Sequence, residues 1–190
     1  MAALKNKEHF EFVTNYENII NLKNKVLKYT EEDWNKYDYR QKTFDPHRFT
    51  KTLPLIWNEL NKDSKRNLEK NGRKFWPEEE KYREDLDAFT KIFENHYGPG
   101  FIATAMFINL PAKKIIEPHV DSYDPFFEKC HRNHLAIITH EDVIFQIEHE
   151  ERNIREGELF QINNNTCQHM VKNGSLIDRV HLLMDWLPTS

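Results

Sequence analysis

The sequence predicts one domain, mainly β with flanking helices, whose core is a β-sandwich or β-barrel. Three observations predict this. Apolar residues follow helical spacing up to about residue 97, short strand-like runs separated by tight turns fill the chain from residue 101, and no linker separates the two parts. Many short strands are typical of sandwiches and barrels, not of alternating strand–helix units. We expect a single domain over residues 1–190, with a mostly helical part (1–98) and a β-core (99–190) that carries the metal-binding motif described below.

The expected helices lie in the first part of the chain. A stripe of apolar residues runs from Ile19 to Leu27, and Thr30 followed by Asp33 is a helix-capping signal. The clearest helix covers residues 77–97. It has a proline at its start, glutamates in its first turn, an apolar face and Gly98 just past its end.

The expected strands follow in close succession. They cover residues 101–110, 135–139, 143–148, 159–163, 169–171 and 179–186. Turn signals separate them at residues 140–142, 156–157, 163–166 and 173–175. We also expect the turn around Asn164 to support the strand that begins at residue 169.

Composition narrows the class of protein. The chain has 13 Phe, 7 Tyr and 4 Trp, enough aromatic side chains to build a core. Its net charge of -4 gives no long-range attraction for nucleic acid, so we expect no nucleic-acid partner. No segment approaches the ~18 apolar residues of a membrane span, so no membrane association is expected. Only 2 Cys are present, which favours a reducing, cytoplasmic location.

The segment 117–121 is the sharpest chemical feature. On an extended segment, residues two apart point to the same side, so His119 and Asp121 can present an imidazole and a carboxylate to one point. His169, on a later strand, is the candidate third ligand. Two histidines and one carboxylate form the face that holds non-haem Fe(II) and leaves positions open for substrate and oxygen. The His-x-Asp pair alone is a weak motif.

Arg179 is predicted to lie beside this face. A hairpin centred on Gly174 would place Arg179 directly opposite His169, with their side chains on one side of the sheet. A buried arginine beside a metal ligand suits the binding of a carboxylate that also reaches the metal, because a guanidinium forms bidentate hydrogen bonds with a carboxylate. The alternative is an exposed Arg179 that pairs with Asp178 or another acid.

Two further positions repeat this pattern with less support. Arg132 and His134 share one side of a strand start, where they either donate to an anionic ligand or form a solvated strand end. His181 shares the side of Arg179 and is interpreted either as a pocket residue or as a hydrogen-bonded core histidine.

Taken in order, these residues resemble the aspartyl/asparaginyl β-hydroxylase family of 2-oxoglutarate- and Fe(II)-dependent oxygenases. The matching segments are residues 116–121, 132–135, 157–160 with Asn163 and Asn164, 169–173, and 179–182 with Asp185. A weaker match covers residues 34–55 and includes Arg40, Gln41, His47 and Thr50. Phe107 departs from the pattern, because animal members have a hydroxyl side chain near that position.

The resemblance implies a double-stranded β-helix (a jelly-roll, cupin-like core) with helices outside. It implies Fe(II) held by His119, Asp121 and His169. It also implies that 2-oxoglutarate chelates the iron, with its far carboxylate at Arg179 and its near carboxylate close to Arg132 and His134. O₂ would be the third reactant.

The activity implied is hydroxylation of an amino acid, or of an amino-acid side chain in a peptide or protein. Small size tilts the expectation toward a small molecule or short peptide. Arg40 and His47 are the candidate contacts for a substrate carboxylate. In the segment 122–129, Tyr123, Phe126 and Phe127 form either a lid or a hydrophobic plug.

Two other functions fit the same residues. One is a cupin-type metal-dependent enzyme, such as a hydrolase or isomerase, that uses the three ligands without 2-oxoglutarate. The other is a non-catalytic module that binds a metal or ligand on the same fold. The first has no use for a carboxylate clamp, so Arg179→Ala should leave its activity nearly intact. The second predicts metal binding without release of succinate.

Overall fold

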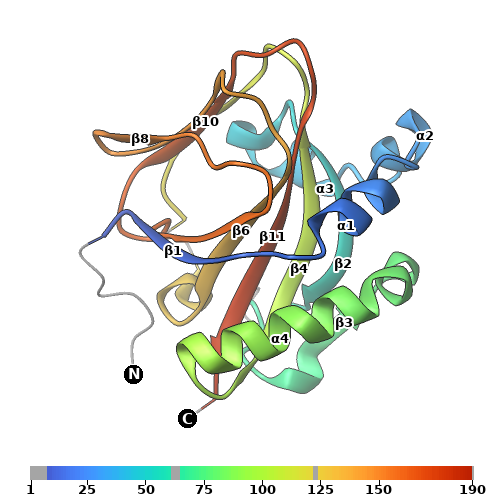
Figure 1. The fold of residues 1–190 in the computed structure, drawn as a ribbon. Helices are drawn as coiled ribbons and strands as arrows, with labels where there is room; N and C mark the ends of the chain where they lie inside the picture. The colour runs from blue at the N-terminus through green and yellow to red at the C-terminus, as the bar shows by residue number, and fades with distance from the viewer. Residues whose placement is uncertain (1–7, 61–64, 122–123, 190) are drawn as a thin grey trace.

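The computed structural model describes residues 8–60, 65–121 and 124–189, which fold around two facing antiparallel sheets (Figure 1). The larger sheet has the strand order β1-β9-β6-β11-β4-β2-β3, and the smaller has the order β5-β10-β7-β8. The larger sheet contains β1 (Phe10–Asn15), β2 (Lys51–Asn58), β3 (Arg73–Phe75), β4 (Gly100–Leu110), β6 (His131–Ile138), β9 (Glu158–Ile162) and β11 (Arg179–Pro188). The smaller contains β5 (Ile115–His119), β7 (Val143–Ile147), β8 (Glu150–Arg152) and β10 (His169–Asn173). The predicted mainly β fold is confirmed.

The N-terminal part contributes strands that the sequence analysis expected to be helical. β1 pairs with β9 and β2 pairs with β4, so both widen the larger sheet. Pro54 lies inside β2, and a proline in an apolar run argues against a sheet strand when only the sequence is read. Their pairing partners lie far along the chain, so local spacing does not reveal these strands.

Helices cover the outside of the larger sheet, as predicted. These outer segments are α1 (Ile19–Val26), α2 (Glu31–Asn35), the 3₁₀ segment η3 (Pro77–Tyr82) and α4 (Arg83–Tyr97), which share one buried cluster with the outer side of β11. The other helical segments are α3 (Tyr39–Thr43) and the 3₁₀ segments η1 (Asp45–His47), η2 (Lys70–Gly72) and η4 (Pro125–Glu128). Thr30 forms a complete capping box with Asp33 at the start of α2. The helix predicted over residues 77–97 is η3 followed by α4, and it ends at Gly98 with a positive φ of 86°.

Alternation along β11 separates the outer core from the inside of the sandwich. Val180, Leu182, Met184 and Trp186 join the cluster that contains the buried face of α4, which crosses this sheet (Figure 1). Phe93 of α4 packs against Trp186, with ring centroids 5.7 Å apart. The intervening residues of β11 face the smaller sheet and include three polar side chains, Arg179, His181 and Asp185, all 1% exposed or less. The helices therefore supply the apolar burial that stabilises the sheet, and the interior is left for polar chemistry.

The predicted hairpin between residues 169 and 179 is wrong. β10 pairs with β5 and β7 in the smaller sheet, whereas β11 pairs with β4 and β6 in the larger one. The side-chain amide of Asn173 donates to the carbonyl oxygens of Leu110 at 3.0 Å and Ile177 at 2.8 Å. These bonds hold the connection as a corner that carries the chain from one sheet to the other. Arg179 lies opposite Leu110, not opposite His169.

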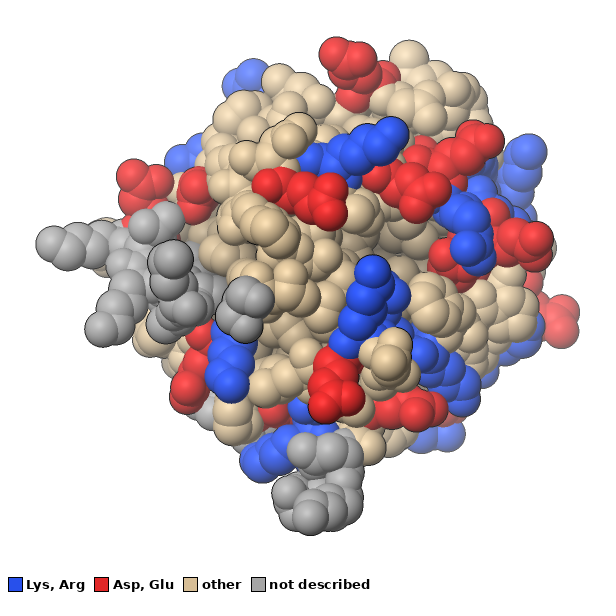
Figure 2. Space-filling model, turned by 90° about the horizontal axis from the view of Figure 1, so that it is seen from below, with Lys and Arg blue, Asp and Glu red and all other residues tan. Residues whose placement is uncertain are grey.

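Positive and negative side chains are interspersed on the face shown in Figure 2. No single-sign patch of Lys and Arg or of Asp and Glu dominates that face. Within the described residues, none of the helices combines the length and the apolar character that crossing a membrane requires.

Candidate metal centre

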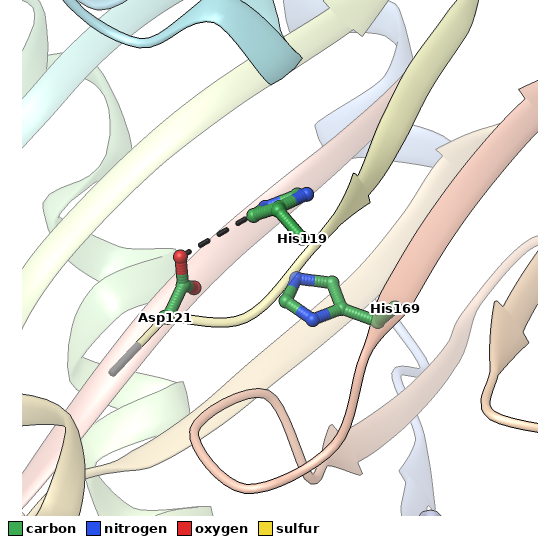
Figure 3. Close-up of side chains that lie close together, drawn as sticks. All are labelled: His119, Asp121 and His169. Carbon is green, nitrogen blue, oxygen red and sulfur yellow. Dashed lines mark ion pairs between the residues drawn. The ribbon is translucent and has the colours of Figure 1, made fainter. Parts of the chain in front are cut away.

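Two histidines and one aspartate meet where β5 ends and β10 begins (Figure 3). The antiparallel register places His119 directly opposite His169, and their ring centroids are 4.2 Å apart. Asp121 follows two residues later, and its backbone N–H donates to the carbonyl oxygen of Asn164 at 2.9 Å. One potential ligand atom from each of the three side chains lies within 4.8 Å of the other two. The structure thus brings together the three residues that the sequence analysis named as metal ligands.

The donor atoms fit a divalent metal ion. The Nδ1–H of His119 donates to the carbonyl oxygen of Glu117 at 2.7 Å, which leaves Nε2 to face Oδ1 of Asp121 at 3.8 Å. This Nε2 is buried and has no hydrogen-bond partner among the described residues. A backbone carbonyl on one ring nitrogen is the usual way of fixing a metal-binding tautomer. Two imidazoles and a carboxylate on one side are ligands suited to non-haem Fe(II).

All three groups have pKa values that favour the metal-binding form. Burial lowers the pKa of His169 to about 4 and also lowers the pKa of His119. Burial alone would raise the pKa of the Asp121 carboxyl, but the charge of Arg132, the largest opposing cause, and a hydrogen bond from the Asn164 side chain help to lower it. At neutral pH the two rings are therefore neutral and the carboxylate is ionised, so few protons compete with a metal.

Arg179 is a buried cation that has no counter-ion among the described residues. Its side chain is 1% exposed, and its Nη2–H donates to Nδ1 of His181 at 2.6 Å. Nε and Nη1 have no partner within the described part of the chain. Burial, followed by the charge of Arg40, lowers the pKa of Arg179 to about 9. An arginine in this state fits an anionic ligand, because a carboxylate would satisfy both the charge and the unpaired N–H groups.

The alternative reading of Arg179 as an exposed residue is therefore wrong. Asp178, its expected partner in that reading, accepts hydrogen bonds from the Asn109 side chain at 3.0 Å and the Ala112 backbone at 3.1 Å. His134 and His181 lie near each other, with ring centroids 5.9 Å apart. Burial lowers the pKa of both rings well below the usual value, so both are neutral, and His181 accepts its hydrogen bond from Arg179 in that form.

Sequence comparison places this arrangement in a family. The model of the aspartyl/asparaginyl β-hydroxylase family matches residues 9–188. The chain belongs to this family. No curated protein matches it in sequence.

Solved structures similar to this family member share its fold. A prolyl-4-hydroxylase from Pseudomonas putida has a TM-score of 0.59 at 9% identity over 97% of this chain and 95% of its own. A prolyl hydroxylase from Trichoplax adhaerens has a TM-score of 0.58 at 13% identity and covers 95% of this chain and 84% of its own. A collagen prolyl hydroxylase from Paramecium bursaria Chlorella virus-1 has a TM-score of 0.55 at 9% identity and covers 99% of this chain and 100% of its own. The jelly-roll that the resemblance implied is confirmed.

Arg132 joins the candidate ligand Asp121 to Asp185. Its Nε and Nη2 donate to the two carboxylate oxygens of Asp185 at 2.8 and 3.0 Å, and its Nη1 donates to Oδ2 of Asp121. Arg132 and His134 are 5% and 6% exposed, so the solvated strand end considered for them is wrong. The sequence analysis assigned Arg132 to a co-substrate carboxylate, and this contact stays a prediction. In the structure its three guanidinium nitrogens already have carboxylate partners.

A cavity of about 320 Å³ opens beside the candidate ligands. Its lining includes His119, Asp121, Arg40 and His47, so both predicted substrate residues lie next to the centre. Nη2 of Arg40 is 3.1 Å from Nε2 of His47, and the His47 ring packs edge-on against His119 at 4.8 Å. Burial is the main cause that lowers the pKa of His47, so the neutral ring accepts from Arg40.

Residues 124–129 lie beside this cavity, and Phe127 lines it. Phe126 and Phe127 are each 1% exposed and belong to a buried cluster with Phe101 and Leu187. These two residues therefore form a hydrophobic plug. The expectation for Tyr123 lies outside the described residues.

Acid is expected to destabilise the metal-free protein. His169 takes up its proton near pH 6.5 when unfolded but only near pH 4 when folded, so the unfolded state binds more protons between these values and stability falls as the pH falls. This residue alone should lower the free energy of unfolding by about 2 kcal/mol between pH 6.5 and about 5. Urea unfolding across that pH range measures the change. A flat profile would contradict it, and His169→Gln should reduce the slope.

Proposed function

We propose that this protein is an Fe(II)- and 2-oxoglutarate-dependent oxygenase that hydroxylates an amino acid or an amino-acid side chain in a peptide or protein. One observation carries the proposal: a His-Asp-His group lies inside the same sandwich as a buried arginine for which the described part of the chain offers no counter-ion. Membership of a hydroxylase family supports it. A metal site alone would not need such an arginine.

The residues have distinct roles in this reaction. His119, Asp121 and His169 would hold Fe(II) and leave its other positions to the reactants. Bound Fe(II) and 2-oxoglutarate supply the oxidising chemistry, in which O₂ converts 2-oxoglutarate to succinate and CO₂ and gives its second oxygen atom to a substrate C–H bond. Arg179 binds the far carboxylate of 2-oxoglutarate. His181 accepts a hydrogen bond from Arg179 and so fixes the direction of its free N–H groups.

Substrate recognition is assigned to the cavity beside the ligands. Arg40 carries a positive charge next to the neutral ring of His47, which suits a substrate carboxylate close to the reacting carbon. The Trichoplax adhaerens enzyme was solved with a peptide fragment of hypoxia-inducible factor, so a fold of this kind accommodates a peptide. Free amino acids and short peptides are therefore the substrates to test first.

Anaerobic titration tests the proposal directly. Fe(II) is added to the metal-free protein, followed by 2-oxoglutarate, and a weak visible charge-transfer band is expected when both are bound. Its absence would count against an oxygenase. On admission of air, succinate should form. Metal binding without succinate would favour a non-catalytic module, and a metal-dependent activity that survives Arg179→Ala would favour a cupin-type enzyme that does not use 2-oxoglutarate.

A further inference from the structure

The carboxylate of Asp121 has one occupied oxygen and one available oxygen. Oδ2 accepts hydrogen bonds from the side-chain amide of Asn164 at 2.9 Å and from Arg132. Oδ1 faces His119 Nε2 at 3.8 Å. Asp121 and Asn164 are 5% and 0% exposed, so water does not compete for these contacts.

Asn164 makes two hydrogen bonds with Asp121. Its backbone carbonyl oxygen accepts from the backbone N–H of Asp121, and its side-chain amide donates to the carboxylate of the same residue. Backbone and side chain are therefore fixed together, and the carboxylate cannot rotate without breaking a buried hydrogen bond.

Asp185 in turn fixes Arg132. It receives two hydrogen bonds from the guanidinium and is itself fully buried. Arg66 forms a longer ion pair with Asp185, with its Nη1 3.8 Å from Oδ2. Two arginines and two aspartates thus form a buried chain of alternating charge that ends at the candidate metal ligand.

We propose that Asn164 and Arg132 hold Asp121 so that a single oxygen, Oδ1, is available to the metal, and that Asp185 holds Arg132 in place for this purpose. In this role all three are positioning residues, because they act on the metal only through Asp121. The consequence is that Asp121 takes one coordination position and the others stay available to the reactants. The inference rests on the proposed function, since it takes Asp121 as a metal ligand.

Cobalt(II) binding tests the role of Asn164 without any turnover. Metal-free Asn164→Ala is titrated with Co(II), and we expect its Kd to rise by about 10-fold, the lower end of what loss of an outer hydrogen-bond partner causes. Asn163→Ala is the matched control. Asn163 is also buried in this turn, but its side-chain oxygen accepts from Thr166 at 2.7 Å. This control should bind Co(II) as the wild type does.

A second variant tests the other half of the chain. Asp185→Asn keeps the size of the side chain but removes the main counter-ion of Arg132. The charge of Arg132 is then balanced by Asp121 alone, so Asp121 should bind Co(II) less tightly and the Kd should again rise. Wild-type affinity in both Asn164→Ala and Asp185→Asn would overturn the inference, as would equal weakening in Asn163→Ala. If the wild-type protein itself binds no Co(II), the proposed function fails first and this inference fails with it.

Discussion

Replacing His169 with alanine is expected to abolish Fe(II) binding and succinate formation. The substitution removes one of the three ligand atoms that lie within 4.8 Å of one another. Loss of an outer hydrogen-bond partner lowers metal affinity about 10- to 100-fold, so loss of a ligand should lower it by more than about 100-fold. Anaerobic equilibrium titration with Fe(II) measures the affinity, and quantified succinate measures the turnover of 2-oxoglutarate.

His140 supplies the matched control for this substitution. It lies in the turn before β7, and its side chain is 41% exposed. His140→Ala removes an imidazole without touching the candidate centre, so it should leave Fe(II) affinity and succinate yield unchanged. Wild-type succinate formation by His169→Ala would show that the three residues are not the metal ligands.

The proximity of two of the three candidate ligands could be predicted from sequence because it depends on short-range geometry. His119 and Asp121 are two residues apart on an extended segment, and that spacing brings them to one side in any strand. His169 required more, because its position depends on strand pairing. The sequence analysis paired it with Arg179 across a hairpin, whereas its actual partner across the sheet is His119. His169 does lie close to His119 and Asp121, as predicted. The pairing of β10 with β5 brings it there, not a hairpin with β11.

The corner after β10 shows what local patterns cannot decide. Asn173-Gly174-Ser175 is typical of a hairpin turn, and nothing near it in the sequence indicates a change of sheet. The deciding contact is the bond from the Asn173 side chain to the carbonyl of Leu110, 63 residues earlier. A contact of this range depends on the completed sandwich, so it lies beyond an analysis of turns.

The partners of Arg132 were missed for the same reason. Asp185 has a recognisable signal, because it lies on the inward-facing side of a strand whose other side is apolar, and a buried carboxylate there requires a cation. Its actual partner follows from the register in which Asp185 lies opposite Arg132. Asn164 gives a weaker signal, since asparagines in turns are common.

Replacing Arg179 with methionine is expected to remove the preference for 2-oxoglutarate. Truncating one partner of a buried charge pair costs about 2–5 kcal/mol, which corresponds to a rise in Kd of roughly 30-fold to several-thousand-fold. The variant should bind 2-oxoglutarate no better than 2-oxopentanoate, which has the same length but lacks the far carboxylate. Anaerobic titration of the Fe(II) protein with each compound gives the ratio. Arg155→Met, at an exposed position, should keep the wild-type ratio.

The same substitution, Arg179→Met, should raise the stability of the metal-free protein although it weakens 2-oxoglutarate binding. A buried cation without a counter-ion destabilises the folded state, because its desolvation is not offset by a partner. Methionine fills similar space without that penalty, so the metal-free Arg179→Met protein should melt at a higher temperature than the wild type. If Tm rises and the preference for 2-oxoglutarate over 2-oxopentanoate is lost, Arg179 serves ligand binding and costs the fold stability. An unchanged preference for 2-oxoglutarate would remove Arg179 from the proposed site, whereas a lower Tm would show that it stabilises the fold.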